Sequence, residues 1–117
     1  MSTFAALLGE TIIHIEGAHP ASEEIVFTLN NGKKYRMYHR QDCCEAVSVT
    51  DVEGDPYDLL WGPLLQCEEV SQVDPSASES GTWTFYKLGT IKGRVTIRWY
   101  GESNGYYSET VDFEEVK

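Results

Sequence analysis

The amino-acid sequence predicts an α+β fold, a mostly antiparallel β-sheet with a short N-terminal helix and one further helical turn. Short runs rich in β-branched and aromatic residues recur along the 117 residues of the chain. Clusters of Gly, Pro, Ser and Asn separate these runs, and the Asn-Gly pair at 31–32 is a hairpin signal. A chain of this length is expected to form one domain, residues 1–117, with a single core.

Helical segments are few and short. Ser2 or Thr3 can cap a short helix through "FAALL" at 4–8, and Gly9 closes it. The stretch "GDPYDLLWGP" at 54–63 favours a single helical turn before the segment "LLQCEEVSQV".

The other regular segments have the composition of strands. Gly-containing turns at 89–93 and 101–105 join the last three, and residues 74–82 form a polar, turn-rich loop. The predicted strands cover residues 11–15, 24–29, 34–39, 45–52, 82–88, 93–101 and 106–116.

The formal net charge of −10 argues against duplex DNA and anionic membranes as partners, because both are bound through accumulated Lys and Arg. The basic residues nevertheless fall into two groups. If the two groups are neighbours in space, they form one local basic face that suits a small anion. The groups are Lys33, Lys34, Arg36 and Arg40, and Lys87, Lys92, Arg94 and Arg98.

Cellular location and redox state follow from two further features. No apolar stretch is as long as a membrane span, and the first ten residues lack the pattern of a signal peptide, so the cytosol is expected. The three cysteines, Cys43, Cys44 and Cys67, are odd in number. Because an adjacent pair rarely bridges to itself, we expect reduced thiols.

Strand periodicity places the candidate binding residues. Along 94–100, Val95, Ile97 and Trp99 are expected in the core, and Arg94 and Arg98 point the other way. Two guanidiniums on one face can hold phosphate oxygens, although the same face can also be solvated and paired with carboxylates. On the preceding strand the residues that share one face are Trp83, Phe85 and Lys87.

Two segments outside these strands carry a dense set of polar groups. In "RMYHRQDCCE" at 36–45, His39 with the cysteines can be considered as a zinc site or a nucleophilic dyad, but the spacing favours neither. The segment "GESNGYYSE" at 101–109 is typical of a hairpin with cross-strand tyrosines. It can also offer a ligand the polar groups and ring of Ser103, Asn104 and Tyr106. No phosphate-loop or dinucleotide motif is present.

Together, the segments "YRMYHRQDCCE", "VTDVEGDPYDLL", "TWTFYK", "IKG" and "IRWYGESNGYYSE" resemble the Thoeris anti-defence sponges of phages and prophages, over about residues 10–115. The resemblance implies a protein that is not an enzyme and has no cofactor. It implies capture, without cleavage, of the cyclic ADP-ribose isomer made by a bacterial TIR-domain immune enzyme, in the host cytoplasm. It also implies a dimer or hexamer with ligand pockets at subunit boundaries and, as in some members of that family, cyclic oligonucleotides held at a separate site.

Such a ligand needs cationic, stacking and hydrogen-bonding groups together. Base stacking on an aromatic ring contributes about 1–3 kcal/mol per base. The alternatives are an enzyme that degrades a cyclic nucleotide signal and a protein that inhibits a host defence complex by direct contact. The candidate ligand-binding residues are Arg36, His39, Arg40, Trp83, Phe85, Lys87, Arg94, Arg98, Ser103, Asn104 and Tyr106.

Overall fold

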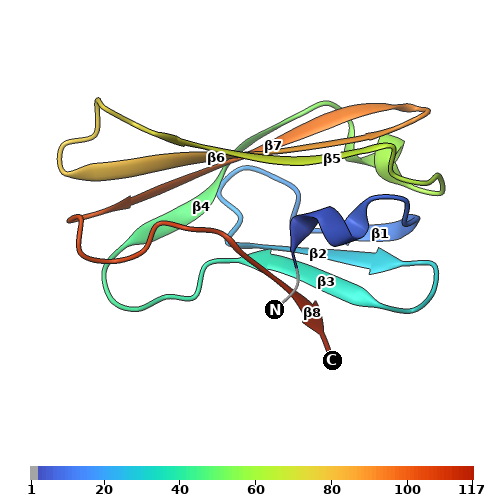
Figure 1. Cartoon of the computed structure of the whole chain (residues 1–117), viewed down its shortest axis with the longest axis horizontal. Helices are drawn as coiled ribbons and strands as arrows, with labels where there is room; N and C mark the ends of the chain where they lie inside the picture. The colour runs from blue at the N-terminus through green and yellow to red at the C-terminus, as the bar shows by residue number, and fades with distance from the viewer. Residues whose placement is uncertain (1–2) are drawn as a thin grey trace.

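The computed structural model describes residues 3–117 and contains two four-stranded antiparallel sheets that lie face to face (Figure 1). The strand order is β1-β2-β3-β8 in one sheet and β4-β7-β6-β5 in the other. The strands are β1 (Ile12–Glu16), β2 (Glu24–Leu29), β3 (Lys34–Tyr38), β4 (Ala46–Glu53), β5 (Gln66–Val73), β6 (Ser80–Thr90), β7 (Gly93–Ser103) and β8 (Asp112–Val116).

The predicted fold class is confirmed, and both helical elements are single 3-10 turns, η1 (Phe4–Leu7) and η2 (Pro56–Leu59). Thr3 occupies the cap position of η1 but its side chain makes no capping hydrogen bond, and the alternative cap Ser2 lies outside the described residues. Asp55 caps η2 through its carboxylate. No helix among residues 3–117 is long and apolar enough to cross a membrane.

The core lies between the two sheets and follows the period-two pattern of the strands. Ile25, Phe27 and Leu29 of β2 point inward, and the predicted inward face of β7 is confirmed, with Trp99 completely buried. β6 and β7 form a long hairpin that begins at Ser80, so the loop predicted at 74–82 is shorter than expected. These two central strands position the outward side chains described below.

The last strand corrects the sequence-based topology. The segment at 101–105 does not connect two paired strands, because β8 leaves this sheet and pairs with β3 of the other. Residues 106–111 instead run across the end of the sandwich, held by the buried carboxylate of Glu109, which accepts hydrogen bonds from Thr82 and Ser103. The crossing chain passes so close to β7 that a Cβ at Gly101 would lie 2.7 Å from the Glu109 carbonyl oxygen. Only glycine fits there.

Candidate functional site

Aromatic and basic side chains gather on the outer face of the β4-β7-β6-β5 sheet. Alternation along β6 and β7 buries every second side chain in the core and turns the others outward. The register places Phe85 beside Arg98 and Trp83 beside Tyr100. We call this surface the aromatic–basic face, and it comprises Trp83, Phe85, Lys87, Arg94, Arg98 and Tyr100.

The rings of the aromatic–basic face pack against one another and against a cation. The centroids of Trp83 and Tyr100 are 4.4 Å apart, with the rings tilted by 51°. The guanidinium carbon of Arg98 lies 5.2 Å from the Trp83 centroid, within cation–π range. The Tyr100 hydroxyl donates to Asp74 at 2.8 Å, and this hydrogen bond raises the pKa of Tyr100 to about 12. The ring of Tyr100 is therefore held in place, and it supports Trp83.

The cations of this face differ in how far they are already engaged. Arg98 donates from Nη2 to Asp51 at 2.5 Å, and its Nε is buried without a hydrogen-bond partner in residues 3–117. Lys87 and Arg94 are exposed, and neither forms an ion pair with another described residue. These two side chains are therefore available to an anionic group that lies on the rings.

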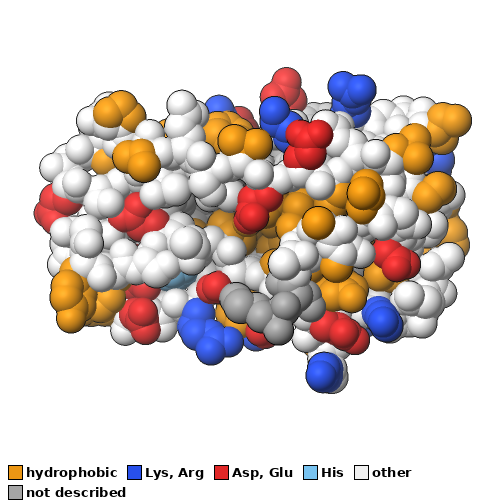
Figure 2. Space-filling view, in the orientation of Figure 1, with side chains coloured by type: hydrophobic (Ala, Val, Ile, Leu, Met, Phe, Trp, Pro, Cys, Tyr) orange, Lys and Arg blue, Asp and Glu red, His pale blue; other side chains and the backbone are white. Residues whose placement is uncertain are grey.

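Acidic residues border the aromatic–basic face. In the sheet register, Asp51 stands beside Arg98 and Glu68 beside Lys87. Figure 2 shows basic and acidic side chains next to each other along the upper edge of the molecule, over this sheet. The surface can therefore select a compact anion over a long polyanion, because an extended phosphate backbone would meet the surrounding carboxylates.

The other predicted basic group lies on the opposite side of the sandwich, so the expectation of one combined basic face is wrong. β3 belongs to the other sheet, and its outward residues point away from β7. Arg36 donates to Glu114 at 2.7 Å and to Glu24 at 3.2 Å, and the Glu114 hydrogen bond raises its pKa. Arg40 donates to the Tyr38 hydroxyl at 3.2 Å. Both guanidiniums already have internal partners.

His39 is part of a buried ion pair at the wall of a cleft, which it lines together with Gln41 and Glu45. Its side chain is 4% exposed and that of Glu45 is 0% exposed. Nε2 lies 2.7 Å from a Glu45 oxygen and Nδ1 lies 2.7 Å from the Thr110 carbonyl oxygen. Since both partners only accept, both ring nitrogens carry hydrogen and the ring is an imidazolium.

Pairing raises the pKa of His39 and lowers the pKa of Glu45. Burial opposes the charged His39 ring, but the hydrogen bonds to Glu45 and Thr110 outweigh it and raise its pKa. The hydrogen bond from His39, followed by those from the backbone of Cys43 and Asp42, lowers the pKa of Glu45 to about 2. The carboxylate thus organises the loop between β3 and β4 around itself, which is a structural role.

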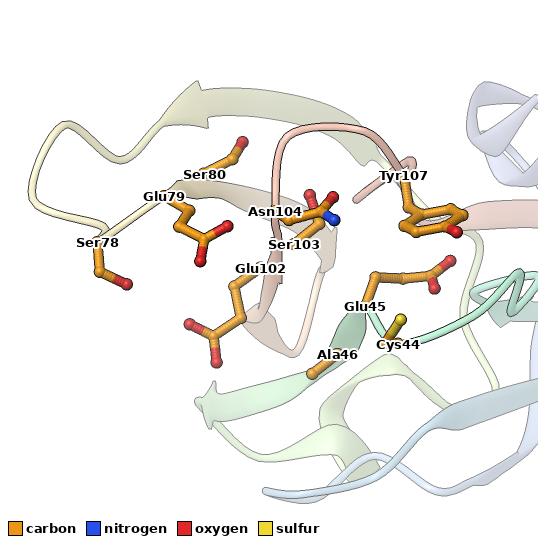
Figure 3. Close-up of a pocket in the computed structure, with 10 residues that line it drawn as sticks. All are labelled: Cys44, Glu45, Ala46, Ser78, Glu79, Ser80, Glu102, Ser103, Asn104 and Tyr107. Atoms are coloured by element: carbon orange, nitrogen blue, oxygen red, sulfur yellow. The ribbon is translucent and has the colours of Figure 1, made fainter.

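A second cleft lies at this end of the molecule and is acidic. It has a volume of about 360 Å³, and Figure 3 shows the carboxylates of Glu79 and Glu102 projecting into it. Two of the predicted ligand-binding residues, Ser103 and Asn104, line it, but no Lys or Arg of the described residues does. Tyr106 is 84% exposed and does not line the cleft; its neighbour Tyr107 does. The cleft is therefore unsuited to a phosphate.

The cysteines correct the expected thiol chemistry. Cys43 and Cys44 are joined by a disulfide. They do not lie on an extended strand, where adjacent side chains would point apart, because the chain turns around Glu45, which accepts from Cys43 N at 2.9 Å. Cys67 is far along the chain, donates to the Phe4 carbonyl at 3.2 Å, and has its pKa raised to about 12 by burial.

Acid–base and metal-ligating side chains are the other groups that can carry chemistry. Among residues 3–117, no three His, Cys, Asp or Glu side chains come together in a way that could hold a metal ion. The most strongly hydrogen-bonded acid–base pair, His39 with Glu45, is buried and fully engaged. Rings and unpaired cations of the described residues come together on the aromatic–basic face, which therefore has free binding capacity.

The fold and this face define the class of protein: a small two-sheet β-protein with a stacking and cationic surface on one sheet. Residues 5–113 match the model of a domain of unknown function, DUF7448, and the chain belongs to this family. No curated protein and no solved structure matches the chain.

Proposed function

We propose that the protein binds and sequesters, without cleaving it, a cyclic ADP-ribose isomer made by a TIR-domain Thoeris enzyme. The site is the aromatic–basic face. The observation that carries the proposal is the gathering of three rings and two cations on one sheet face. The rings are Trp83, Phe85 and Tyr100, and the cations, Lys87 and Arg94, have no ion-pair partner in the described part of the chain. In this role the protein acts in the host cytoplasm as a phage anti-defence sponge.

The chemistry of the ligand matches the groups of the face. Adenine can stack on Trp83 or Phe85, and the pyrophosphate can lie against Lys87 and Arg94, with Arg98 beside them. The mixed charge around the face favours a compact ligand with few phosphates. Cyclic oligonucleotides, which present several bases and phosphates, are ligands of the same chemistry for a separate site between subunits.

The affinity that a sponge requires indicates an oligomer. Competition with a receptor needs a dissociation constant near nanomolar, which corresponds to about 12 kcal/mol. A ligand of this size reaches such affinity only when most of its surface is enclosed, and the face of one sheet covers a single side. A second subunit in a dimer or hexamer can supply the remaining walls.

Ligand recovery tests the proposal. The protein is mixed with an equimolar amount of the cyclic ADP-ribose isomer, and binding is measured by calorimetry. The complex is then heated, and the released small molecule is analysed by chromatography. Intact ligand is expected. A cleaved product would instead support the alternative that the protein is an enzyme degrading the signal.

An inhibitor of a host defence complex is the second candidate, and one surface favours it. At the end formed by the β6–β7 turn and the loop before β5, Trp61, Leu65 and Ile91 are exposed, Ile91 by 87%. The two segments are connected there by the hydrogen bond from Lys92 Nζ to the Leu60 carbonyl oxygen, 2.6 Å long. Exposed apolar patches are typical of protein contacts. Absence of ligand binding, with capture of the TIR-domain enzyme or its effector through this end, would favour this function.

A further inference from the structure

β5 is an edge strand, and no strand among residues 3–117 pairs with its outer side. It pairs only with β6, and its residues from Glu68 to Val73 are all exposed. An unpaired edge of this length is a ready template for pairing with another strand.

The ladder shows which backbone groups of β5 point outward. Asp74 N donates to the Gly81 carbonyl oxygen in the same register as the rest of the β5–β6 pair. In an antiparallel ladder, hydrogen-bonded pairs alternate with non-hydrogen-bonded pairs. The backbone groups of the even-numbered residues of β5 therefore bond to β6. The backbone groups of Glu69, Ser71 and Val73 therefore point away from the sheet, and within residues 3–117 they have no hydrogen-bond partner.

The other edges of the two sheets are covered or blunted. β4 exchanges hydrogen bonds at Val49 with Ala21 and Ser22, and its register is interrupted by a bulge. β1 accepts at Ile12 from Trp61 N and is also bulged. β8 has five residues, three of them acidic. Bulges, short length and charge are the usual protections of edge strands. β5 has no bulge; η1 contacts its beginning at Cys67, and its charged residues are Glu68 and Glu69.

We propose that the β5 edge pairs antiparallel with β5 of a second copy of this chain, about a two-fold axis at Val70. A two-fold axis normal to the sheet keeps the outward side chains of both copies on the same side. Each pair therefore joins two even-numbered residues or two odd-numbered residues. Centring on Val70 places Glu69 opposite Ser71 and Glu68 opposite Gln72 of the second copy. Centring on Glu69 would oppose two glutamates, and centring on Ser71 would oppose Glu68 and Asp74. Like charges directly opposite each other destabilise a pair, which disfavours both of these neighbouring centres. Centring on Gln72 opposes no like charges but pairs only residues 71–73 of the strand, whereas centring on Val70 pairs residues 67–73.

This pairing joins two aromatic–basic faces into one surface, a consequence that rests on the proposed function, whereas the pairing itself does not. Val70 lies beside Phe85 in the register and is 45% exposed. In the dimer, two Val70 side chains meet between two Phe85 rings, which are about 14 Å apart at a spacing of about 4.8 Å per strand. The second copy thereby extends the apolar surface on which a nucleotide stacks.

Crosslinking tests the interface and its register. The Val70→Cys variant is expected to form a covalent dimer under mild oxidation, because opposed residues at a non-hydrogen-bonded position lie at disulfide distance. Gln72→Cys, the matched control on the same face, is expected to crosslink far less, because the two copies of residue 72 are offset along the strands. Crosslinking of Gln72→Cys but not Val70→Cys would overturn the register.

Sedimentation velocity tests the association itself. The wild-type protein is expected to sediment at twice the chain mass of 13.2 kDa. Ser71→Pro removes an outward N–H without touching the β6 ladder, and it is expected to weaken the dimer by on the order of 10-fold or more, whereas Ser71→Thr retains it. A monomer at all concentrations, or a dimer that resists Ser71→Pro and shows no Val70→Cys crosslink, would overturn the proposal.

Titration with the cyclic ADP-ribose isomer separates the two proposals. A dimer that binds no ligand leaves the interface standing and removes the proposed function. Equal affinity of the wild-type dimer and the Ser71→Pro monomer would show that the two faces do not share a ligand.

Discussion

The aromatic–basic face and the loop that follows β3 contain similar residue types but differ in what folding leaves free. In the loop, His39 and Glu45 are buried and satisfy each other and the surrounding backbone. On the face, rings are half-exposed and Lys87 and Arg94 have no ion-pair partner among the described residues. A dense run of polar and aromatic residues in sequence therefore does not mark a binding site by itself. A binding site is marked instead by side chains that keep unused binding capacity once the chain has folded.

Breaking the buried pair should have the largest effect, on stability and not on binding. His39→Ala leaves the Glu45 carboxylate buried without its counter-ion, which costs about 3 kcal/mol and lowers the melting temperature by on the order of 10 °C. Thermal unfolding followed by circular dichroism measures this. His14→Ala, at an exposed pair with Glu16, is the control and should change little. Equal effects of the two variants would remove the buried pair as a determinant of stability.

Removing the stacking ring should have the next largest effect, on binding. Trp83→Ala is expected to weaken binding of the cyclic ADP-ribose isomer by about 2 kcal/mol, because one base loses the ring on which it stacks. Tyr107→Ala, which removes a ring that lines the acidic cleft, distinguishes the two regions in the same calorimetric titration and is expected to leave the affinity unchanged. A loss in Tyr107→Ala instead would move the site to the cleft.

Removing one exposed cation should have a smaller effect that depends on salt. Lys87→Ala is expected to reduce affinity roughly 3- to 5-fold at low ionic strength and less at high ionic strength, because exposed charges are screened. Lys33→Ala, on the turn before β3, is the matched control. Titrations at two salt concentrations provide the measurement, and an identical response of both variants would argue against a local anion contact.

The smallest expected effect is the change of stability with pH near neutrality. The pKa of His39 is raised above its ordinary 6.5, so its contribution is complete below pH 6.5 and is lost as the pH rises through the raised value. The pKa of Glu45 is lowered from 4.5 to about 2, so its contribution is complete above pH 4.5 and is lost as the pH falls toward 2. The melting temperatures of wild type and His39→Ala should thus differ most between pH 4.5 and 6.5 and converge at alkaline pH. A difference that grows with pH would contradict the assignment of an imidazolium.

The strands and their faces could be predicted from the sequence because they depend on local composition and a period of two. The inward set on β7 and the shared outward face of Trp83, Phe85 and Lys87 follow from alternation alone. The partner of each strand could not be predicted in the same way. β8 pairs with β3, about 78 residues away in sequence, and this placement depends on the buried Glu109 and on the close approach at Gly101.

Because strand partners could not be predicted from local patterns, the sequence also grouped candidate residues that the structure separates. Arg36 and Arg98 have equal potential for phosphate in sequence, and only the sheet assignment shows that they lie on opposite sides of the sandwich. The alternation along β7 turns Tyr100 outward, but its support of Trp83 depends on the cross-strand register and on Asp74. The engagement of Arg36 by Glu24 and Glu114 also arises from pairing between distant strands.

Chemical-shift mapping with the cyclic ADP-ribose isomer tests the central claim most directly. The three tryptophans provide separate indole N–H signals, from exposed Trp61, from Trp83 on the aromatic–basic face and from buried Trp99. The account predicts that the Trp83 signal and the amides of β6 and β7 around Phe85 and Arg98 shift on titration, while the Trp61 signal and the amides of Ser103 and Asn104 stay in place. Shifts confined to the acidic cleft or to the Trp61 end, or no shift at all, would contradict it.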